Sequence, residues 1–244
     1  MSDLHLQESH PRTADAFFRF LAAHAAHAEQ LYLLGDIFEY WAGDDDLDAP
    51  LNRRVVAALR ALADGGLQIF WMAGNRDFLV GDGFAAAAGL RLLDEPHVIA
   101  VGGQRIALVH GDAECTLDTK YMEFRAMVRD KRWQAQFLAM PLAQRKAIIA
   151  GLREGSREAH TTKSYAIMDV TPHAIEAVFD ATGADVLIHG HTHRPALHIH
   201  DERRRYVLPD WELDNGADEP PRGGWIAVDE GGAVTRHALD GSLL

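Results

Sequence analysis

The chain has 244 residues, an ordinary balance of apolar and charged side chains, and a formal net charge of −12. This length suits one large domain, or a domain with an insertion, and the composition excludes a disordered chain. The negative charge argues against a nucleic-acid binder, because neutralising phosphates requires a basic face. A single cysteine excludes a disulfide framework, and no apolar run approaches the ~20 residues that span a bilayer. We therefore expect a soluble, cytoplasmic protein.

Helices and short apolar strands alternate through the first half of the chain. Apolar residues at helical spacing indicate amphipathic helices, and short apolar runs that end in polar residues indicate buried parallel strands. The predicted elements are an extended segment at Met1–Leu6, a helix at Asp15–Gln30, a strand at Leu31–Leu34, a helix at Pro50–Asp64, a strand at Gln68–Ala73, and a hairpin of Val98–Val101 with Arg105–Val109.

The second half returns to the same pattern after a long helical segment. A helix begins at Pro172 with Thr171 as its N-cap, and the apolar run Asp185–Ile188 follows it. The alternating runs after Pro195 predict a closing antiparallel β layer. These runs are Ala196–His200, Arg204–Leu208, Trp225–Val228 and Ala233–His237.

Five apolar runs, counting the short first one, each end in residues that can hold a metal ion. These residues are Asp3 and His5, Asp36, Asn75, His110, and His191 with His193. One such residue alone would have a structural explanation, such as capping the next helix. Loops at the carboxyl ends of parallel strands converge in α/β folds, so the five together predict a single site. The loop His189-Gly-His-Thr-His193 adds two imidazoles directed toward one point.

These seven candidate ligands are too many for one tetrahedral ion. Two ions that share a carboxylate fit the set better. Imidazole, carboxylate and amide-oxygen donors suit Mn²⁺, Fe²⁺ or Zn²⁺, and the absence of thiolate argues against a structural zinc. Two ions ~3.5–4 Å apart lower the pKa of bound water and clamp the oxygens of an in-line displacement at phosphorus. The sequence therefore predicts a dinuclear hydrolase.

The motif order resembles the calcineurin-like metallophosphoesterase superfamily. The motifs are Asp3-x-His5, Gly35-Asp36, Gly74-Asn75, His110-Gly111 and Gly190-His191-x-His193. The resemblance implies an α/β fold, a two-sheet sandwich flanked by helices, with a dinuclear centre. It also implies that Asp3, His5, Asp36 and His193 hold one ion. Asp36, Asn75, His110 and His191 would hold the other, with Asp36 as the bridge.

Longer segments resemble one family within it, the UDP-2,3-diacylglucosamine diphosphatases. They are Ser2–Leu6, Leu34–Trp41, Gly74–Phe78, His110–Asp112 with Cys115–Asp118, and His189–Pro195. This implies hydrolysis of a nucleotide-linked glycolipid to UMP and 2,3-diacylglucosamine 1-phosphate, in lipid A biosynthesis of Gram-negative bacteria, typically with Mn²⁺. Family positions for catalysis correspond to Asn75, Arg76, His110 and His191. Those for substrate contact correspond to Asn75, Arg76, Asp118, Ser156, His160, Lys163 and His191, although relatives commonly carry Asn in place of His160.

Arg76 supports a diphosphate substrate on chemical grounds. Many superfamily members carry a histidine at this position, which can protonate an alkoxide leaving group. Arg76 cannot act as a general acid because its pKa is too high. It can instead hold phosphate oxygens in a bidentate fork as negative charge builds. A phosphate leaving group departs without a proton, so Arg76 suits pyrophosphate cleavage better than cleavage of an alkyl phosphate.

Residues 115–165 carry ten lysines and arginines against five acidic residues, a local charge of +5. Tyr121, Trp133 and Phe137 occupy apolar positions of predicted helices there. One interpretation is an ordinary helical insertion whose charges are solvated and whose aromatic residues pack on the sandwich. The other is a helical cap, with an apolar lining for acyl chains and a basic face that attracts a diphosphate and an anionic membrane.

The family resemblance favours the cap. The expected division is a core of residues 1–114 and 166–244 with a cap of residues 115–165 over the metals. The expected partners are the glycolipid substrate and, through peripheral contact, the cytoplasmic face of the inner membrane. We expect no nucleic-acid partner and a monomer.

Two other functions stay open at this stage. A phosphoesterase for soluble nucleotides or other phosphate esters would not need the basic, aromatic insertion or Arg76. A binding scaffold without chemistry would not need the full ligand set. Relatives also carry a few apolar residues before the motif that starts at Ser2, whereas Met1 directly precedes it here. Either translation starts upstream, or the shortened strand lowers stability and weakens metal binding.

Overall fold

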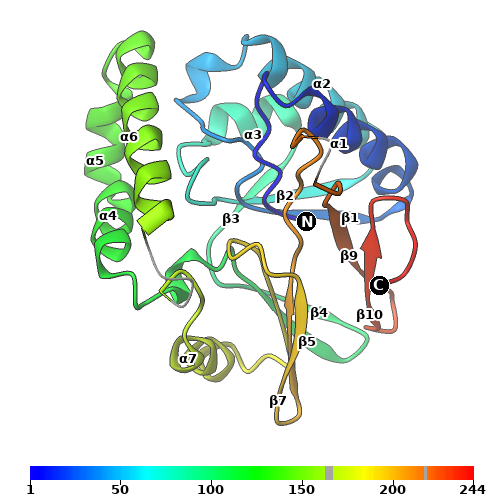
Figure 1. Ribbon diagram of the computed structural model, residues 1–244. Helices are drawn as coiled ribbons and strands as arrows, with labels where there is room; N and C mark the ends of the chain where they lie inside the picture. The colour runs from blue at the N-terminus through cyan, green and yellow to red at the C-terminus, as the bar shows by residue number, and fades with distance from the viewer. Residues whose placement is uncertain (163–166, 217–218) are drawn as a thin grey trace.

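The computed structural model describes residues 1–162, 167–216 and 219–244, with the backbone alone for residues 154–162 (Figure 1). The helices are α1 (Pro11–Ala23), α2 (Pro50–Asp64), α3 (Asp82–Ala88), α4 (Thr119–Arg129), α5 (Lys131–Leu138), α6 (Leu142–Thr162) and α7 (Pro172–Thr182). The strands are β1 (Gln30–Leu34), β2 (Gln68–Met72), β3 (Arg91–Leu93), β4 (His97–Val101), β5 (Gln104–Leu108), β6 (Val186–His189), β7 (Ala196–His200), β8 (Arg203–Val207), β9 (Gly224–Val228) and β10 (Val234–Ala238).

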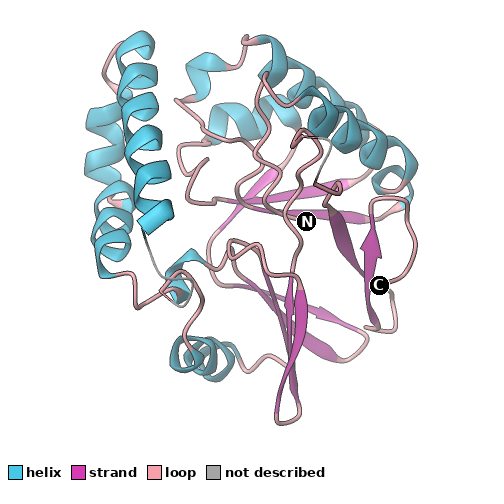
Figure 2. Cartoon of the chain, viewed as in Figure 1, coloured by secondary structure: helices cyan, strands magenta, loops and turns pink. Residues whose placement is uncertain are grey.

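Two sheets form the sandwich, as the family resemblance implies. The first is the parallel sheet β1-β2-β3, and the second has the order β4-β5-β6-β8-β7, while β9 and β10 form a separate hairpin. Figure 2 shows α1, α2 and α3 on the side of the first sheet and α7 on the side of the second. The predicted α/β sandwich flanked by helices is confirmed.

Side-chain alternation along the strands builds the layers. On β1, Leu31 and Leu33 pack with residues of α1, α2 and α3, whereas Leu34 packs between the two sheets. On β6, Ile188 joins that inter-sheet core and Leu187 packs against α7. β6 is buried on both faces along its whole length, and β1 is buried on both faces toward its end, because layers pack on each side of the sheet. These runs are therefore apolar throughout, and the polar ligands follow only where the strands end.

The N-terminal segment lies beside β1 although it carries no regular strand. Leu34 N–H donates to Met1 C=O at 2.8 Å, and Asp3 N–H donates to Gly35 C=O at 3.1 Å. Leu4 is fully buried and Leu6 nearly so. Backbone pairing and burial thus fix the register of this segment. The weaker stability and metal binding expected of a shortened first strand stay predictions.

Two secondary-structure predictions are wrong in part. The first helix begins at Pro11 and ends at Ala23, followed by a short 3₁₀ turn, instead of spanning Asp15–Gln30. Asp214 accepts the N–H groups of Arg12 and Thr13. This cap, distant in sequence, explains why α1 begins earlier than predicted.

The C-terminal runs do not form one antiparallel layer. β8 pairs in parallel with β6, which incorporates β7 and β8 into the second sheet.

Between residues 119 and 162 the chain forms the predicted helices, and α4, α5 and α6 stand together beside the sandwich (Figure 1). The expected boundary at residues 165 and 166 lies outside the described residues. Arg145 of α6 is almost fully buried and bonds the carbonyls of Met140 and Ala42 and the carboxylate of Asp45. This side chain fastens the helical segment to the core.

Among the described residues, none of the helices has the length and apolar composition that crossing a bilayer requires.

Replacing Arg145 with alanine should destabilise the protein by about 2–3 kcal/mol, because buried carbonyl groups lose their donor and a packed side chain is removed. Urea unfolding would measure the change. Lys146→Gln is the matched control, since it removes a lysine that is 36% exposed and pairs with Asp46, and glutamine can still donate a hydrogen bond; it should cost under about 1 kcal/mol. Equal losses for the two variants would contradict a structural role for the buried guanidinium.

Candidate metal centre

The five predicted strand-end loops meet at one place in the fold. They bring together two groups of side chains whose donor atoms lie within 4.8 Å of one another in each group. The first group is Asp3, His5 and His193, and the second is Asp36, His110 and His191. Asn75 lies within the second group, so all seven predicted ligands are present at this edge of the sheets. The assignment of these groups to two ions, with Asp36 as the bridge, stays a prediction.

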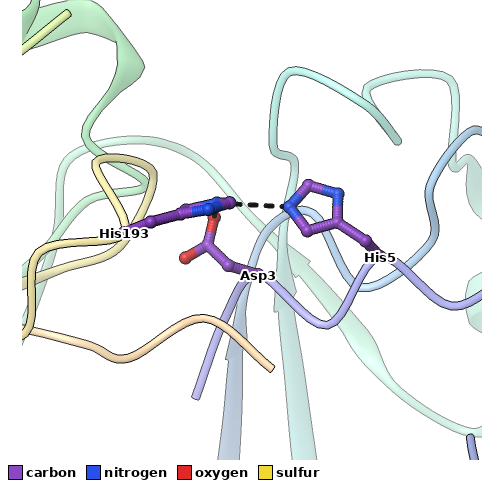
Figure 3. A group of neighbouring side chains, drawn as sticks. All are labelled: Asp3, His5 and His193. Atoms are coloured by element: carbon purple, nitrogen blue, oxygen red, sulfur yellow. Dashed lines mark hydrogen bonds and ion pairs between the residues drawn. The ribbon is translucent and has the colours of Figure 1, made fainter. Parts of the chain in front are cut away.

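The first group joins the two ends of the motif series (Figure 3). His5 Nε2 lies 3.3 Å from His193 Nε2, and Asp3 Oδ1 lies 3.4 Å from the same atom of His193. Glu39 Oε2 lies 2.9 Å from His5 Nδ1. A carboxylate at Nδ1 favours the tautomer with hydrogen on Nδ1, which leaves the Nε2 lone pair free for a metal. Asp3, His5 and His193 therefore each present a donor atom to the same place.

The second group is arranged around the amide of Asn75. Asn75 Oδ1 lies 2.8 Å from His191 Nδ1 and 3.1 Å from His110 Nε2. Asp36 Oδ2 lies 3.8 Å from His110 Nε2. His110 Nδ1 donates to the carbonyl of Leu34 at 2.8 Å, which presents Nε2 toward the group. Amide oxygen, carboxylate oxygen and two imidazole nitrogens thus face one point.

Five of the seven predicted ligands have left-handed backbone conformations. They are Asp3, His5, Asp36, His191 and His193, with φ between 49° and 64°. Residues with a Cβ avoid this region at a cost of about 1–3 kcal/mol each, and such strain concentrates at functional sites. The hydrogen bonds and burial around these loops over-determine the conformation. The backbone turns sharply after each strand, and each turn directs a donor inward.

Two glycines of the motifs permit the close approach of neighbouring loops. A Cβ on Gly74 would overlap Asp36 Oδ1 and the Asp36 backbone nitrogen. A Cβ on Gly190 would overlap the side chains of Ser2 and Asp3. The side chains of Asp36 and Asp3 can therefore reach the centre only because these two positions lack a side chain.

Asp77 holds the two central loops together. It is fully buried and accepts N–H groups from Gly74 at 2.8 Å, Ile37 at 2.8 Å and Asp36 at 3.2 Å. Burial and the charge of Asp36 raise the pKa of Asp77 to about 6. One carboxylate thus ties the loop after β1 to the loop after β2, which are distant in sequence.

The electrostatics of the centre favour a cation. Although burial opposes the charged form, Asp36 and Asp112 raise the pKa of His110 to about 9. Burial, together with the neighbouring His110, lowers the pKa of His191 to about 3, so its imidazole is neutral and available as a ligand. Asp3 Oδ1 is buried and accepts no hydrogen bond from any described residue. A buried carboxylate oxygen without a hydrogen bond, surrounded by imidazole and amide side chains, fits a divalent ion.

The other predicted site residues are placed less completely. Arg76 follows Asn75, and its backbone N–H donates to Asp36 Oδ1 at 2.7 Å. Asp118 is buried and caps α4, accepting the N–H of Tyr121 at 3.1 Å. Ser156 and His160 belong to α6, where only the backbone is described, and Lys163 lies outside the described residues. Their predicted substrate contacts stay predictions.

Several supporting residues were missed by the sequence analysis. Glu39 contacts His5, Asp210 Oδ2 lies 3.7 Å from His193 Nδ1, and Tyr121 stacks on His191 with ring centroids 6.0 Å apart. The Tyr121 hydroxyl donates to Asp112 at 2.5 Å. A usable signal existed for three of the acids, because each follows a strand-end motif within three residues: Glu39, Asp77 and Asp112. Asp210 lies after β8, where the sequence carries no such motif. Nothing in the pattern marked Tyr121.

Comparison with known proteins gives a consistent result. A profile of calcineurin-like phosphoesterases matches residues 1–195, which include all seven predicted ligands. A UDP-2,3-diacylglucosamine hydrolase of Chromohalobacter salexigens is 50% identical over 232 residues, covering 91% of this chain and 94% of the relative. Proteins of the same name from Aromatoleum aromaticum and Bordetella parapertussis are 50% and 47% identical, covering 88% and 95% of this chain and 89% and 91% of their own.

Replacing Gly74 with alanine should displace Asp36 and weaken metal binding at the second group at least about tenfold, the loss typical when a ligand's support is disturbed. Metal content after dialysis against Mn²⁺ would be measured by mass spectrometry. Gly151→Ala in α6 is the control, because open space surrounds that position and alanine favours a helix. Retention of the wild-type metal content by the Gly74 variant would show that the close approach is not needed.

Proposed function

The chain belongs to the calcineurin-like phosphoesterase family, and from this membership we propose that it hydrolyses the pyrophosphate bond of UDP-2,3-diacylglucosamine. The products are UMP and 2,3-diacylglucosamine 1-phosphate, which places the reaction in lipid A biosynthesis. The observation that carries the proposal is near-full-length similarity to relatives of that name, in a chain whose seven candidate ligands converge. A binding scaffold would have no need to keep these donors together.

Asp3, His5, Asp36 and His193 would hold one divalent ion, and Asp36, Asn75, His110 and His191 the other. When bound, two such ions lower the pKa of water and neutralise charge on phosphoryl oxygens. The protein fixes the donors before substrate arrives, since their backbones are held by Asp77 and by burial. The mixed nitrogen and oxygen donor set suits Mn²⁺, which we propose as the native ion.

Arg76 supplies the chain's own electrostatic contribution. It adjoins Asn75, and its backbone is fixed by the bond to Asp36. Its guanidinium is a planar fork of N–H donors, which suits binding of phosphoryl oxygens rather than protonation of a leaving group. The leaving group of a diphosphate needs no proton. This favours the diphosphate over the alternative of an alkyl phosphate monoester, although a soluble nucleotide diphosphate would satisfy the same chemistry.

The helical segment distinguishes a lipid-linked substrate from a soluble one. It exposes large apolar side chains that a water-facing insertion would not need: Leu117 before α4, and Met127, Leu138, Ile148 and Leu152 on the helices. We propose that they line the path of the acyl chains, with Asp118, Ser156, His160 and Lys163 contacting the substrate nearby. The exposed basic residues Lys120, Lys131 and Arg132 would meet anionic lipid headgroups at the cytoplasmic face of the inner membrane. We propose that the protein acts there as a monomer.

The test is a product assay. Chelator-treated protein would be incubated with UDP-2,3-diacylglucosamine in mixed micelles, with and without Mn²⁺, and products identified by mass. UMP and the lipid 1-phosphate should appear only with the metal. His191→Ala should lower kcat by orders of magnitude because it removes a donor of the second group. Equal turnover of UDP-glucose and the lipid substrate would favour the soluble-nucleotide alternative.

Arg76→Ala should lower kcat by about 10²–10³-fold, the loss typical when a donor to developing charge is removed. Arg76→Lys should recover only part of the activity, because an ammonium group lacks the planar fork. Arg19→Ala, at an exposed position of α1, is the control and should leave kcat unchanged. Steady-state kinetics on the lipid substrate would decide, and a full-activity Arg76→Ala enzyme would remove this residue from the mechanism.

A further inference from the structure

The helical segment contacts the supports of both ligand groups through arginine side chains. We propose that Arg153 of α6 is a positioning residue for His5, acting through Glu39, so that placement of the cap and metal affinity are coupled. The inference rests on the proposed function, since it takes His5 as a metal ligand. It adds a dependence of the metal centre on a residue far from the strand-end motifs.

Glu39 is shared between the cap and the ligand, one oxygen for each. Glu39 Oε1 accepts from Arg153 Nη2 at 2.6 Å and from Nε at 3.1 Å. Glu39 Oε2 lies 2.9 Å from His5 Nδ1. The carboxylate is largely buried, which makes each contact stronger than it would be in water. Arg153 therefore fixes the direction in which Glu39 presents its second oxygen to His5.

Contacts on both sides hold Arg153 in this place. Its guanidinium lies 5.4 Å from the ring centroid of Tyr40, and Nη2 also lies 3.3 Å from Gln7 Oε1. Gln7 and Tyr40 belong to the loops that carry His5 and Asp36. The guanidinium group of Arg153 thus contacts both ligand loops, while the backbone of Arg153 belongs to α6 of the cap. Moving α6 would release His5 from its oriented tautomer.

A matching set of contacts reaches the second ligand group from α4. Arg125 Nη2 donates to Glu95 Oε2 at 2.9 Å, and Glu95 Oε1 accepts the backbone N–H of His110 at 2.6 Å. Arg129 Nη2 donates to the carbonyls of Ala73 and Gly74, at 3.0 and 3.1 Å, directly before Asn75. The cap thus contacts supports of both groups, and the path through Glu39 ends at a ring nitrogen of the candidate ligand His5.

Coupling of this kind is reciprocal. If docking of α6 orients His5, then loss of the Arg153 contact lowers metal affinity, and loss of the metal loosens the contact. The chain offers a control for docking alone. Lys146, also on α6, pairs with Asp46 at 2.7 Å, and Asp46 contacts no predicted ligand. A variant there breaks a cap–core ion pair without touching the metal centre.

The experiment is a calorimetric titration of Mn²⁺ into chelator-treated, full-length protein. Wild type should bind two ions. Arg153→Gln should bind one ion with affinity about tenfold lower, within the range for lost supporting contacts, and the other ion unchanged. Lys146→Gln should match wild type. Arg153→Lys should recover part of the loss, and Glu39→Gln combined with Arg153→Gln should lose no more than Glu39→Gln alone.

The outcomes separate this inference from the proposed function. Two ions bound to Arg153→Gln with wild-type affinity would overturn the coupling and leave the dinuclear centre intact. Equal losses in Arg153→Gln and Lys146→Gln would also overturn it, since cap docking in general would then be the cause. A wild-type protein that binds no Mn²⁺ would overturn both. Circular dichroism of each variant would confirm that it is folded before the titration.

Discussion

Backbone crowding at the ends of the strands is the constraint on which the rest of the structure depends. The candidate ligand side chains converge because the backbone turns sharply directly after each strand, and most of these ligands adopt a left-handed backbone conformation. Gly74 and Gly190 leave room for the neighbouring carboxylates, and Asp77 satisfies the backbone N–H groups that the sharp turns expose. The strain is offset by the apolar layers on both sides, since burial of strand side chains is the dominant favourable contribution.

The charge pattern of the chain has a structural explanation as well as a functional one. The core is strongly acidic and the helical segment basic, and several of the basic side chains face core carboxylates rather than solvent. Arg125, Arg145, Lys146 and Arg153 all have such a partner. The surplus of basic side chains that suggested attraction to a diphosphate or a membrane therefore also attaches the helical segment to the core. Only part of this surplus is left for a ligand.

Much of the fold and the site could be predicted from the sequence because local signals carry them. Pro50–Asp64 has a proline at its start and glycines at its end, and the helix has those bounds. Five of the seven candidate ligands follow an apolar run, and the loops at the carboxyl ends of parallel strands converge. What could not be predicted depends on distant partners: the early start of α1 on Asp214, the pairing of β8 with β6, and the contact of Glu39 with Arg153.

The central claim is that the strand-end loops form a centre for two metal ions. Anomalous diffraction from crystals grown with Mn²⁺, recorded at a wavelength where manganese scatters anomalously, tests it most directly. Two peaks are expected, one among Asp3, His5 and His193 and one among Asp36, Asn75, His110 and His191. A single peak elsewhere, or none at saturating Mn²⁺, would contradict it.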